Sequence, residues 1–265
     1  MRNKMKRAAA VLFAVTALGA CAKKEASQSA RDGERAVLLA AAASLKNVFE
    51  KDLIPRFKAE SGITVDGVYD SSGRLQTQIT QGLEADVFFS AAMTQMNALV
   101  SGGYVNAGEV VPLLQNRLVL IKRLGAQTPV TGFENISAAR TVAIGAPDSV
   151  PAGAYAKEAL AALGVWDTLF TKSTVSEGTN VTEVLNWVAA GSAEAGIVYA
   201  TDAASNGNVE VIAVLKDGIL AQPVIYPAAP LAKAAHKAEA AKLLDFLRSD
   251  AAAAIFEEYG FSKNK

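Results

Sequence analysis

The sequence predicts an α/β fold in which parallel sheets carry helices on both faces. The chain has 265 residues, 51% of them hydrophobic, which is enough for two domains of ordinary size or one large α/β unit. Short apolar runs alternate with longer segments whose apolar residues recur every three or four positions, a pattern typical of strands followed by helices. In such sheets ligands bind beyond the carboxyl ends of the strands, where the helices begin.

The first twenty residues are expected to be absent from the mature protein. MRNKMKR is basic, AAAVLFAVTALGA is apolar but too short for an obvious membrane span, and LGAC ends at Cys21, the only cysteine. This pattern is that of a bacterial lipoprotein signal at 1–20, with Cys21 as the lipidated N-terminus. The alternative is an ordinary secretion signal with an incidental Cys21. Residues 21–35 are polar and are expected to form a linker.

The charge of the remaining chain argues against a nucleic-acid partner. Residues 1–20 hold four of the 26 Lys and Arg and none of the 26 Asp and Glu, which leaves 22 basic and 26 acidic residues and a net charge of −4. No later segment is long enough for a transmembrane helix. We therefore expect a body outside the cytoplasmic membrane, in the periplasm or at the cell surface, held to the membrane only through its lipid anchor.

The elements follow one another in order along the chain. The strand candidates are short apolar runs at 36–42, 63–69, 85–92, 118–122, 141–145, 195–200 and 209–214. The helix candidates have an apolar face and lie at 44–60, 73–83, 152–164, 180–191 and 234–259, the last in one or two pieces. Pro55 weakens the second half of the first helix. Glycine ends the helices at 152–164 and 180–191.

Four predicted helix starts share the same chemistry, which is hydroxyls or bare amides, small neighbours and no cation. They lie in the segments AAASLK, DSSGRL, VPAGAY and GTNVTEVL. Ser44 and Asn180 are expected to be N-caps, Ser71 and Ser72 stand before a helix, and Pro151 suits a first helical position. A helix N-terminus has unpaired N–H donors and the positive end of a dipole, so it favours anions.

A polar residue at a helix start is usually only a cap, so no one of these four positions by itself indicates a site. Several neutral donors that converge can nevertheless hold a dianion without a cation. The stretch GAPDSVPAGAYA (145–156) fits this idea, because it looks like an anion loop with no basic residue. Its one charged residue, Asp148, is expected to brace the turn rather than to touch the ligand.

Six segments together resemble the periplasmic molybdate-binding proteins, the substrate-capturing components of molybdate ABC importers. They are AAASLKNVFE, YDSSGRLQTQI, ADVFFSAAMTQM, AIGAPDSVPAGAYAKEAL, NVTEVLNWVAAGSAEAGIVYATDA and the closing YGF. The resemblance extends from about Val37 to Phe261. It implies a two-lobed periplasmic-binding-protein fold of type II, a Venus flytrap in which each lobe is a sheet flanked by helices. Lobe 1 would be 36–115 plus 227–265 and lobe 2 would be 116–226, with hinge crossings near Gln115–Asn116 and Tyr226.

The resemblance also implies the ligand and its contacts. Molybdate or tungstate would lie in the cleft between the lobes, held by neutral groups and with no cofactor. Ser44 and Ser72 would contact the oxyanion by hydroxyl and amide, Ala152 and Val181 by backbone N–H, and Tyr199 by its hydroxyl. In this sense the five residues form the site of a metal oxyanion and not of a bare cation. The implied partners are the permease and ATPase subunits of the transporter, and the protein itself would be a monomer.

Other function classes receive little support from the sequence. The one histidine, His236, is expected to be a solvated residue on a polar helix, so a Ser–His–Asp triad or a multi-His metal site is not predicted. No P-loop motif is present, and Asp86 and Asp202 are interpreted as structural. We therefore expect no enzyme. Two alternatives stay open: the same fold with another oxyanion, and a surface lipoprotein that binds a protein partner.

Overall fold

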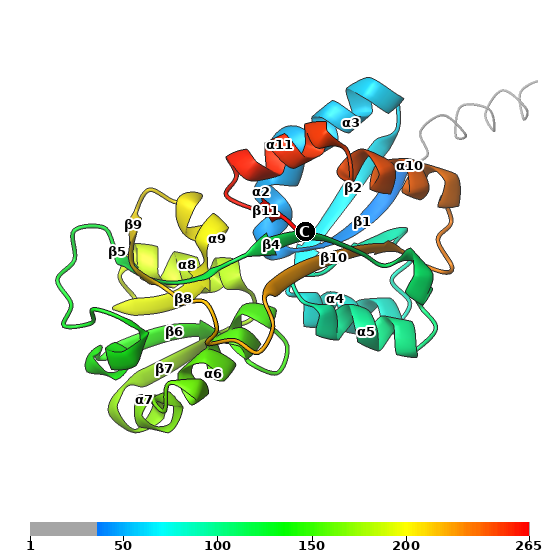
Figure 1. Ribbon diagram of the computed structural model, residues 1–265. Coiled ribbons are helices and arrows are strands. Elements are labelled where there is room, and N and C mark those ends of the chain that lie inside the picture. The colour runs from blue at the N-terminus through cyan, green and yellow to red at the C-terminus, as the bar shows by residue number, and fades with distance from the viewer. Residues whose placement is uncertain (1–35, 265) are drawn as a thin grey trace, which may run out of the picture. The chain divides into compact units, whose positions relative to one another are not determined.

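The computed structural model describes residues 36–264, which form two β-sheets, each flanked by helices (Figure 1). The sheet of the first lobe has six strands in the order β11-β4-β10-β3-β1-β2, and that of the second lobe has five in the order β7-β6-β8-β5-β9. The predicted two-lobed α/β class is therefore confirmed. The signal peptide, Cys21 and the linker lie outside the described residues. Within the described part, no helix has the length and apolarity needed to cross a membrane.

The first lobe combines elements from both ends of the described chain. Its strands are β1 (Ala36–Ala42), β2 (Thr64–Asp70), β3 (Val87–Phe89), β4 (Val111–Asn116), β10 (Val224–Pro230) and β11 (Ser262–Lys263). Its α-helices are α2 (Lys46–Val48), α3 (Ile54–Ser61), α4 (Ser72–Thr80), α5 (Met93–Ser101), α10 (Lys237–Leu247) and α11 (Asp250–Glu258). Two 3-10 turns, η1 (Ala43–Leu45) and η3 (Ala107–Glu109), and a π turn, η2 (Phe49–Leu53), complete it.

The second lobe is built from the middle of the chain. Its strands are β5 (Leu118–Arg123), β6 (Thr141–Gly145), β7 (Thr174–Gly178), β8 (Ala195–Tyr199) and β9 (Val209–Val214). Its helices are η4 (Phe133–Ala138), α6 (Pro151–Ala162), α7 (Trp166–Lys172), α8 (Val181–Ala190) and α9 (Ala200–Ala204). Figure 1 shows β4 and β10 side by side where the chain passes between the lobes.

The prediction of purely parallel sheets is wrong for the strands near the crossings. β1 pairs in parallel with β2 and β3, and β6 with β7 and β8, but β10 is antiparallel to β3 and β4, and β5 to β8 and β9. The reason is the path of the chain. It leaves the first lobe along β4 and returns along the adjacent β10, so these two neighbours must run in opposite directions.

The chain passes from β4 to β5 at Arg117, and it returns through residues 215–223. In the six-stranded sheet, Val224 pairs with Asn116, Ile225 with Gln115 and Tyr226 with Leu114. The exact lobe boundaries stay a prediction.

The helix predicted over 44–60 is interrupted by the π turn η2. Pro55 has no N–H to donate to the carbonyl four residues earlier, and the turn of wider helix stands just before it. The apolar face that predicted this helix is nevertheless intact. Its five residues are each at most 2% exposed: Leu45, Val48, Phe49, Leu53 and Phe57.

Asp86 is buried, at 1% exposure, and ties β1 to the start of α10. Its carboxylate accepts the backbone N–H of Leu38 and that of His236, both at 2.9 Å. The His236 ring nitrogen Nδ1 lies 3.0 Å from the same carboxylate. The structural interpretation of Asp86 therefore agrees with its contacts. The expectation that His236 is simply a solvated residue is wrong. Its backbone N–H and its ring nitrogen Nδ1 both contact the buried Asp86 carboxylate at the start of α10.

We expect Asp86→Ala to lower the free energy of unfolding by about 3 kcal/mol, because two backbone N–H groups lose their buried acceptor. Urea denaturation measures this loss. The matched control is Asp66→Ala, because Asp66 is exposed on β2. If the two variants had equal stability, the carboxylate of Asp86 would not be the link between β1 and α10.

Candidate functional site

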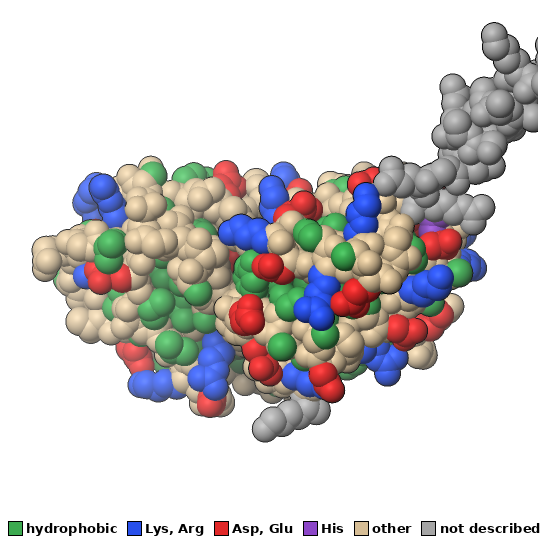
Figure 2. All heavy atoms as spheres, turned by 90° about the horizontal axis from the view of Figure 1, so that it is seen from above, with side chains coloured by type: hydrophobic (Ala, Val, Ile, Leu, Met, Phe, Trp, Pro, Cys, Tyr) green, Lys and Arg blue, Asp and Glu red, His purple; other side chains and the backbone are tan. Residues whose placement is uncertain are grey.

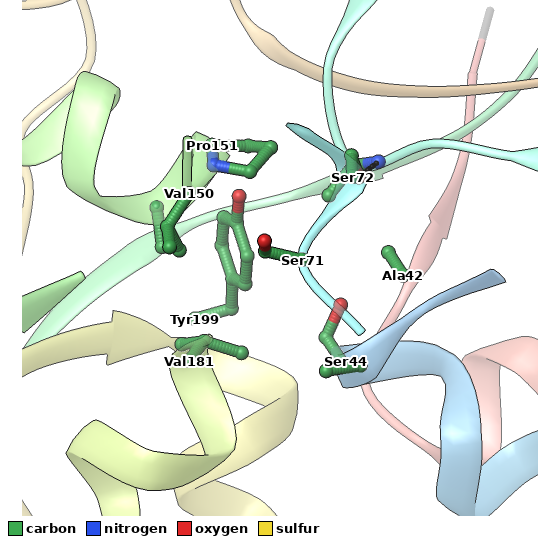
Figure 3. Close-up of a pocket in the computed structure, with 11 residues that line it drawn as sticks. Ala42, Ser44, Ser71, Ser72, Val150, Pro151, Val181 and Tyr199 are labelled. Atoms are coloured by element: carbon green, nitrogen blue, oxygen red, sulfur yellow. Dashed lines mark hydrogen bonds between the residues drawn. The ribbon is translucent and has the colours of Figure 1, made fainter. Parts of the chain in front are cut away.

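A small pocket lies between the lobes and is built from the ends of strands and the starts of helices (Figure 3). Its cavity volume is about 10 Å³, far below the roughly 300–1,000 Å³ of clefts that hold larger organic ligands. Eleven residues line it: Ala42, Ala43, Ser44, Ser71, Ser72, Ala91, Val150, Pro151, Ala152, Val181 and Tyr199. All five residues implied by the family resemblance are among them.

None of the described residues that line the pocket has a charged side chain. Its positive character comes from the N-termini of three helices, α4, α6 and α8. Ser72 and Val181 are the first residues of α4 and α8, and Ala152 is the second of α6. Backbone N–H groups in the first turn have no partner within their helix, and the helix dipole adds positive potential there. The predicted positions of Pro151 at a first helical residue and of Asn180 as an N-cap are confirmed.

Both serines of the predicted set have a protein partner for their hydroxyl oxygen. Ser72 is fully buried, and its Oγ accepts the N–H of Ala91 at 2.9 Å. Ser44 Oγ lies 2.9 Å from the hydroxyl of Tyr226. A serine hydroxyl also carries one proton, which Ser72 can turn toward a ligand. The expectation that Ser44 is an N-cap is wrong: it lies inside η1, and the capping position belongs to Ala42.

The hydroxyl of Tyr199 is the most informative atom of the pocket. The residue is 1% exposed, and among the described residues its hydroxyl has no hydrogen-bond partner. Figure 3 shows the ring standing at the end of β8 with its hydroxyl on the side of Pro151. Burial raises the pKa of Tyr199 well above its ordinary value, so the group keeps its proton. The Tyr226 hydroxyl is close enough to raise this pKa further, but it does not meet hydrogen-bond geometry with Tyr199. A buried hydroxyl without a partner costs about 1–3 kcal/mol, which an acceptor in the pocket would offset.

Asp202 is a buried carboxyl close to this wall of the pocket, three residues after Tyr199. Burial raises its pKa to about 7, and the backbone N–H of Tyr199 acts in the opposite direction. Its Oδ2 has no partner within the described chain. An ionised Asp202 would repel an anion in the pocket, so anion binding favours its protonated form. The structural interpretation of Asp202 therefore leaves out an electrostatic effect on the site.

The two lobes touch directly at the rim of the pocket. Gly73, in the first turn of α4, donates its N–H to the carbonyl oxygen of Ser149 in the second lobe at 3.1 Å. A Cβ on Gly73 would collide with this carbonyl group. The sheets therefore come together here only because position 73 has no side chain. We call this contact the Gly73–Ser149 contact.

The loop that carries Ser149 is held by its own backbone. The N–H groups of Ser149 and Val150 both donate to the carbonyl oxygen of Ala146, at 3.1 and 2.8 Å. Asp148 is exposed and has neither a hydrogen bond nor an ion pair with a described residue. The prediction that Asp148 braces this turn is therefore wrong, because the backbone already does so.

Two lobes that meet over a small pocket with neutral donors define a class of protein that captures a solute by closing around it. Comparison with known proteins supports this class. Residues 37–262 match the model of the bacterial extracellular solute-binding protein family. YvgL of Bacillus subtilis (strain 168), described as a candidate substrate-binding lipoprotein of an ABC transporter, is 37% identical over 95% of this chain and 96% of its own. The chain belongs to the family of bacterial extracellular solute-binding proteins.

Two further proteins show the same relationship. The molybdate-binding protein ModA of Escherichia coli (strain K12) is 34% identical over 86% of this chain and 90% of its own. The solved structure of the periplasmic molybdate-binding protein of Azotobacter vinelandii superimposes with a TM-score of 0.76 over 86% of this chain and 100% of its own, at 24% identity. The latter similarity confirms the type II periplasmic-binding-protein fold.

The sequence did not indicate every residue that shapes the pocket. Ala91 comes from the loop after β3, 19 residues away from Ser72, and no local pattern connects the two. The sequence indicates only that Ser71 precedes a helix, whereas in the structure Ser71 is the N-cap of α4. The Gly73–Ser149 contact joins segments 76 positions apart. The glycine in DSSG was the one available signal for such a close approach.

We expect Gly73→Ala to weaken binding of molybdate, the ligand that the resemblance implies, by tenfold or more. The added methyl group collides with Ser149 only when the lobes are together, so the thermal unfolding temperature should change little. Isothermal titration calorimetry and a thermal melt test the two halves of this expectation. Gly108→Ala is the matched control, since a Cβ there meets no atom within 4 Å. Equal affinities of the two variants would show that closure does not depend on this contact.

Proposed function

We propose that the protein is the extracytoplasmic substrate-binding component of a molybdate ABC importer. It takes up molybdate, and tungstate, between its lobes and delivers the anion to a membrane permease driven by an ATPase subunit. The membership in a family of solute-binding proteins and the similarity to proteins named for molybdate binding support this function. The observation that carries it is the Tyr199 hydroxyl, a buried donor that has no partner among residues 36–264, in a pocket that these residues line without a charged side chain.

In this proposal the oxyanion replaces the missing partners of the pocket's donors. Ser44 and Ser72 bind it by hydroxyl and amide, Ala152 and Val181 by backbone N–H, and Tyr199 by its hydroxyl. A hydrogen bond to a charged group contributes about 1.5–3 kcal/mol. About six of them exceed the roughly 8 kcal/mol of a micromolar complex. The surplus is consumed in closing the lobes and in removing water from the dianion.

Size and protonation together select the ligand. Sulfate is a smaller tetrahedral dianion than molybdate, so a ring of donors spaced for molybdate contacts it poorly. Phosphate at neutral pH keeps a proton that needs an acceptor, whereas the pocket offers donors. Tungstate is nearly the size of molybdate, so the pocket should discriminate little between these two anions.

We also propose that the protein is a lipoprotein anchored to a membrane. Residues 1–20 act as a lipoprotein signal, Cys21 carries the lipid, and the solute-binding body works as a monomer on this anchor. The lipoprotein description of YvgL supports the anchor. We propose no enzymatic activity. Figure 2 shows basic side chains lying among acidic ones on the face it presents, so on that face the attraction for anions has to come from the pocket itself.

We expect molybdate and tungstate to bind the purified protein at micromolar concentration or below, and sulfate to bind far more weakly, because the donors are spaced for the larger anions. Isothermal titration calorimetry with the three anions measures this order. Equal affinity for sulfate would contradict the size argument and favour another oxyanion as cargo. If none of the three anions gave a binding signal, the alternative of a lipoprotein that binds a protein partner would be favoured.

We expect Tyr199→Phe to lower the affinity for molybdate by about tenfold, since one hydrogen bond to a charged ligand is lost. The stability of the empty protein should stay equal or rise, because the removed hydroxyl has no hydrogen-bond partner in the described part of the chain. Calorimetry and urea denaturation separate the two effects. Tyr104→Phe is the control, because the Tyr104 hydroxyl donates to Thr80 outside the pocket. A loss of stability at unchanged affinity would mean that Tyr199 is a structural residue only.

A further inference from the structure

A buried chain of polar side chains leads from the hinge to Ser44. Asn116, the last residue of β4, donates through Nδ2 to Thr201 Oγ1 at 2.9 Å and to the Tyr226 hydroxyl oxygen at 3.3 Å. The Tyr226 hydroxyl in turn lies 2.9 Å from Ser44 Oγ. All four side chains are at most 8% exposed. Of the four, only Ser44 lines the pocket.

The first bond of this chain has a defined direction. The N–H of Arg117 donates to Asn116 Oδ1 at 2.8 Å, so the oxygen end of the Asn116 amide faces Arg117 and the nitrogen end faces Thr201 and Tyr226. An amide nitrogen carries two protons and accepts none. The phenol oxygen of Tyr226 is therefore an acceptor toward Asn116.

The second bond follows from the first. With Asn116 as its donor, Tyr226 has one proton to place, and Ser44 Oγ is its hydrogen-bond partner on that side. The distance allows either hydroxyl to donate, and donation by Tyr226 pairs its buried proton with Ser44 Oγ; in the reverse arrangement that proton would have to turn toward Tyr199 or stay unpaired, the latter at about 1–3 kcal/mol. Burial raises the pKa of Tyr226 well above 10, so the phenol keeps this proton at any ordinary pH.

We propose that Asn116 and Tyr226 are positioning residues that hold the Ser44 hydroxyl as a hydrogen-bond donor to the ligand. Asn116 donates to the Tyr226 oxygen, and Tyr226 donates its proton to Ser44 Oγ from behind, so the Ser44 proton turns into the pocket. The inference rests on the proposed oxyanion function. It adds a specificity determinant outside the lining: anions that carry no proton find a donor at Ser44, and anions such as hydrogen phosphate do not find an acceptor there.

Ser72, the other serine of the pocket, also has its hydroxyl oxygen in a hydrogen bond with the protein. Ser72 Oγ accepts the N–H of Ala91 at 2.9 Å, so it too has an oxygen occupied by the protein and a proton left over. The two serines differ in their partner: a backbone N–H donates to Ser72, whereas a side-chain hydroxyl donates to Ser44. A side-chain hydroxyl can be removed by mutation, so the role of Tyr226 can be tested by deleting one oxygen atom.

The test is Tyr226→Phe, which removes the donor and keeps the ring. That ring packs edge-on against Tyr199 and Phe261, with centroids 5.6 and 5.4 Å apart. We expect the affinity for molybdate to fall roughly three- to tenfold, the effect of one misdirected hydrogen bond. The ratio of sulfate to hydrogen phosphate affinity, measured by competition against molybdate, should fall as well. These two anions are similar in size and differ in the proton, so a merely looser pocket would not change the ratio.

A double-mutant cycle with Ser44→Ala shows whether Tyr226 acts through Ser44. In the Ser44→Ala background, Tyr226→Phe should change molybdate affinity by less than about twofold. Asn116→Ala should lower affinity in the same direction and lose its effect in the same background. Tyr104→Phe is the control for removal of a tyrosine hydroxyl elsewhere. Thermal melts of each variant show that it is folded.

Two results would overturn the inference: additive effects in the cycle, or an unchanged sulfate to hydrogen phosphate ratio in Tyr226→Phe. Failure of the proposed function looks different, because the wild-type protein itself would then not bind molybdate. In that case the cycle is measured with whichever oxyanion binds. If none binds, the positioning role of Tyr226 is refuted together with the site.

Discussion

The structure depends on one constraint, which is that the pocket between the lobes is lined by neutral donors and, among the described residues, by no basic side chain. The starts of α4, α6 and α8 meet there because each follows the end of a strand or a short loop at the facing edges of the two sheets. Backbone N–H groups and hydroxyls are weaker partners than Lys or Arg, so several must converge. In return, the empty pocket contains no buried basic group whose desolvation would have to be offset.

Convergence requires that the lobes come together, and small residues make this possible. Gly73 approaches Ser149 at a distance where any side chain would collide. Much of the pocket lining consists of small alanine side chains, which leave the backbone close to the pocket: Ala42, Ala43, Ala91 and Ala152. In the proposed function, the ligand stabilises the closed arrangement because it contacts donors from both lobes. A transporter that separated the lobes would then also remove the ligand from the donors of one lobe.

Local patterns in the sequence predicted the elements that carry strong apolar periodicity, and the family resemblance predicted the pocket residues. Elements without such periodicity were missed. The strand β10, VIYPAAP, contains two prolines, which argue against a strand unless it lies near an edge or an irregularity. The strand β7, TVSEG, is mostly exposed and polar. The bond from Ala91 to Ser72 and the one from Tyr226 to Ser44, across 182 positions, could not be read from local spacing.

Polar groups behind the pocket show how binding and stability oppose each other here. Thr201, Asn116 and Tyr226 satisfy one another, and their order fixes which way Ser44 points. Tyr199 and Asp202, a few residues along the same segment, each keep a buried oxygen without a partner. A fold optimised only for stability would pair or replace such groups. Only Tyr199 of these two lines the pocket. In the proposed function, the free energy lost at its hydroxyl on folding is recovered when an acceptor enters and the lobes close around it, whereas Asp202 has to stay protonated.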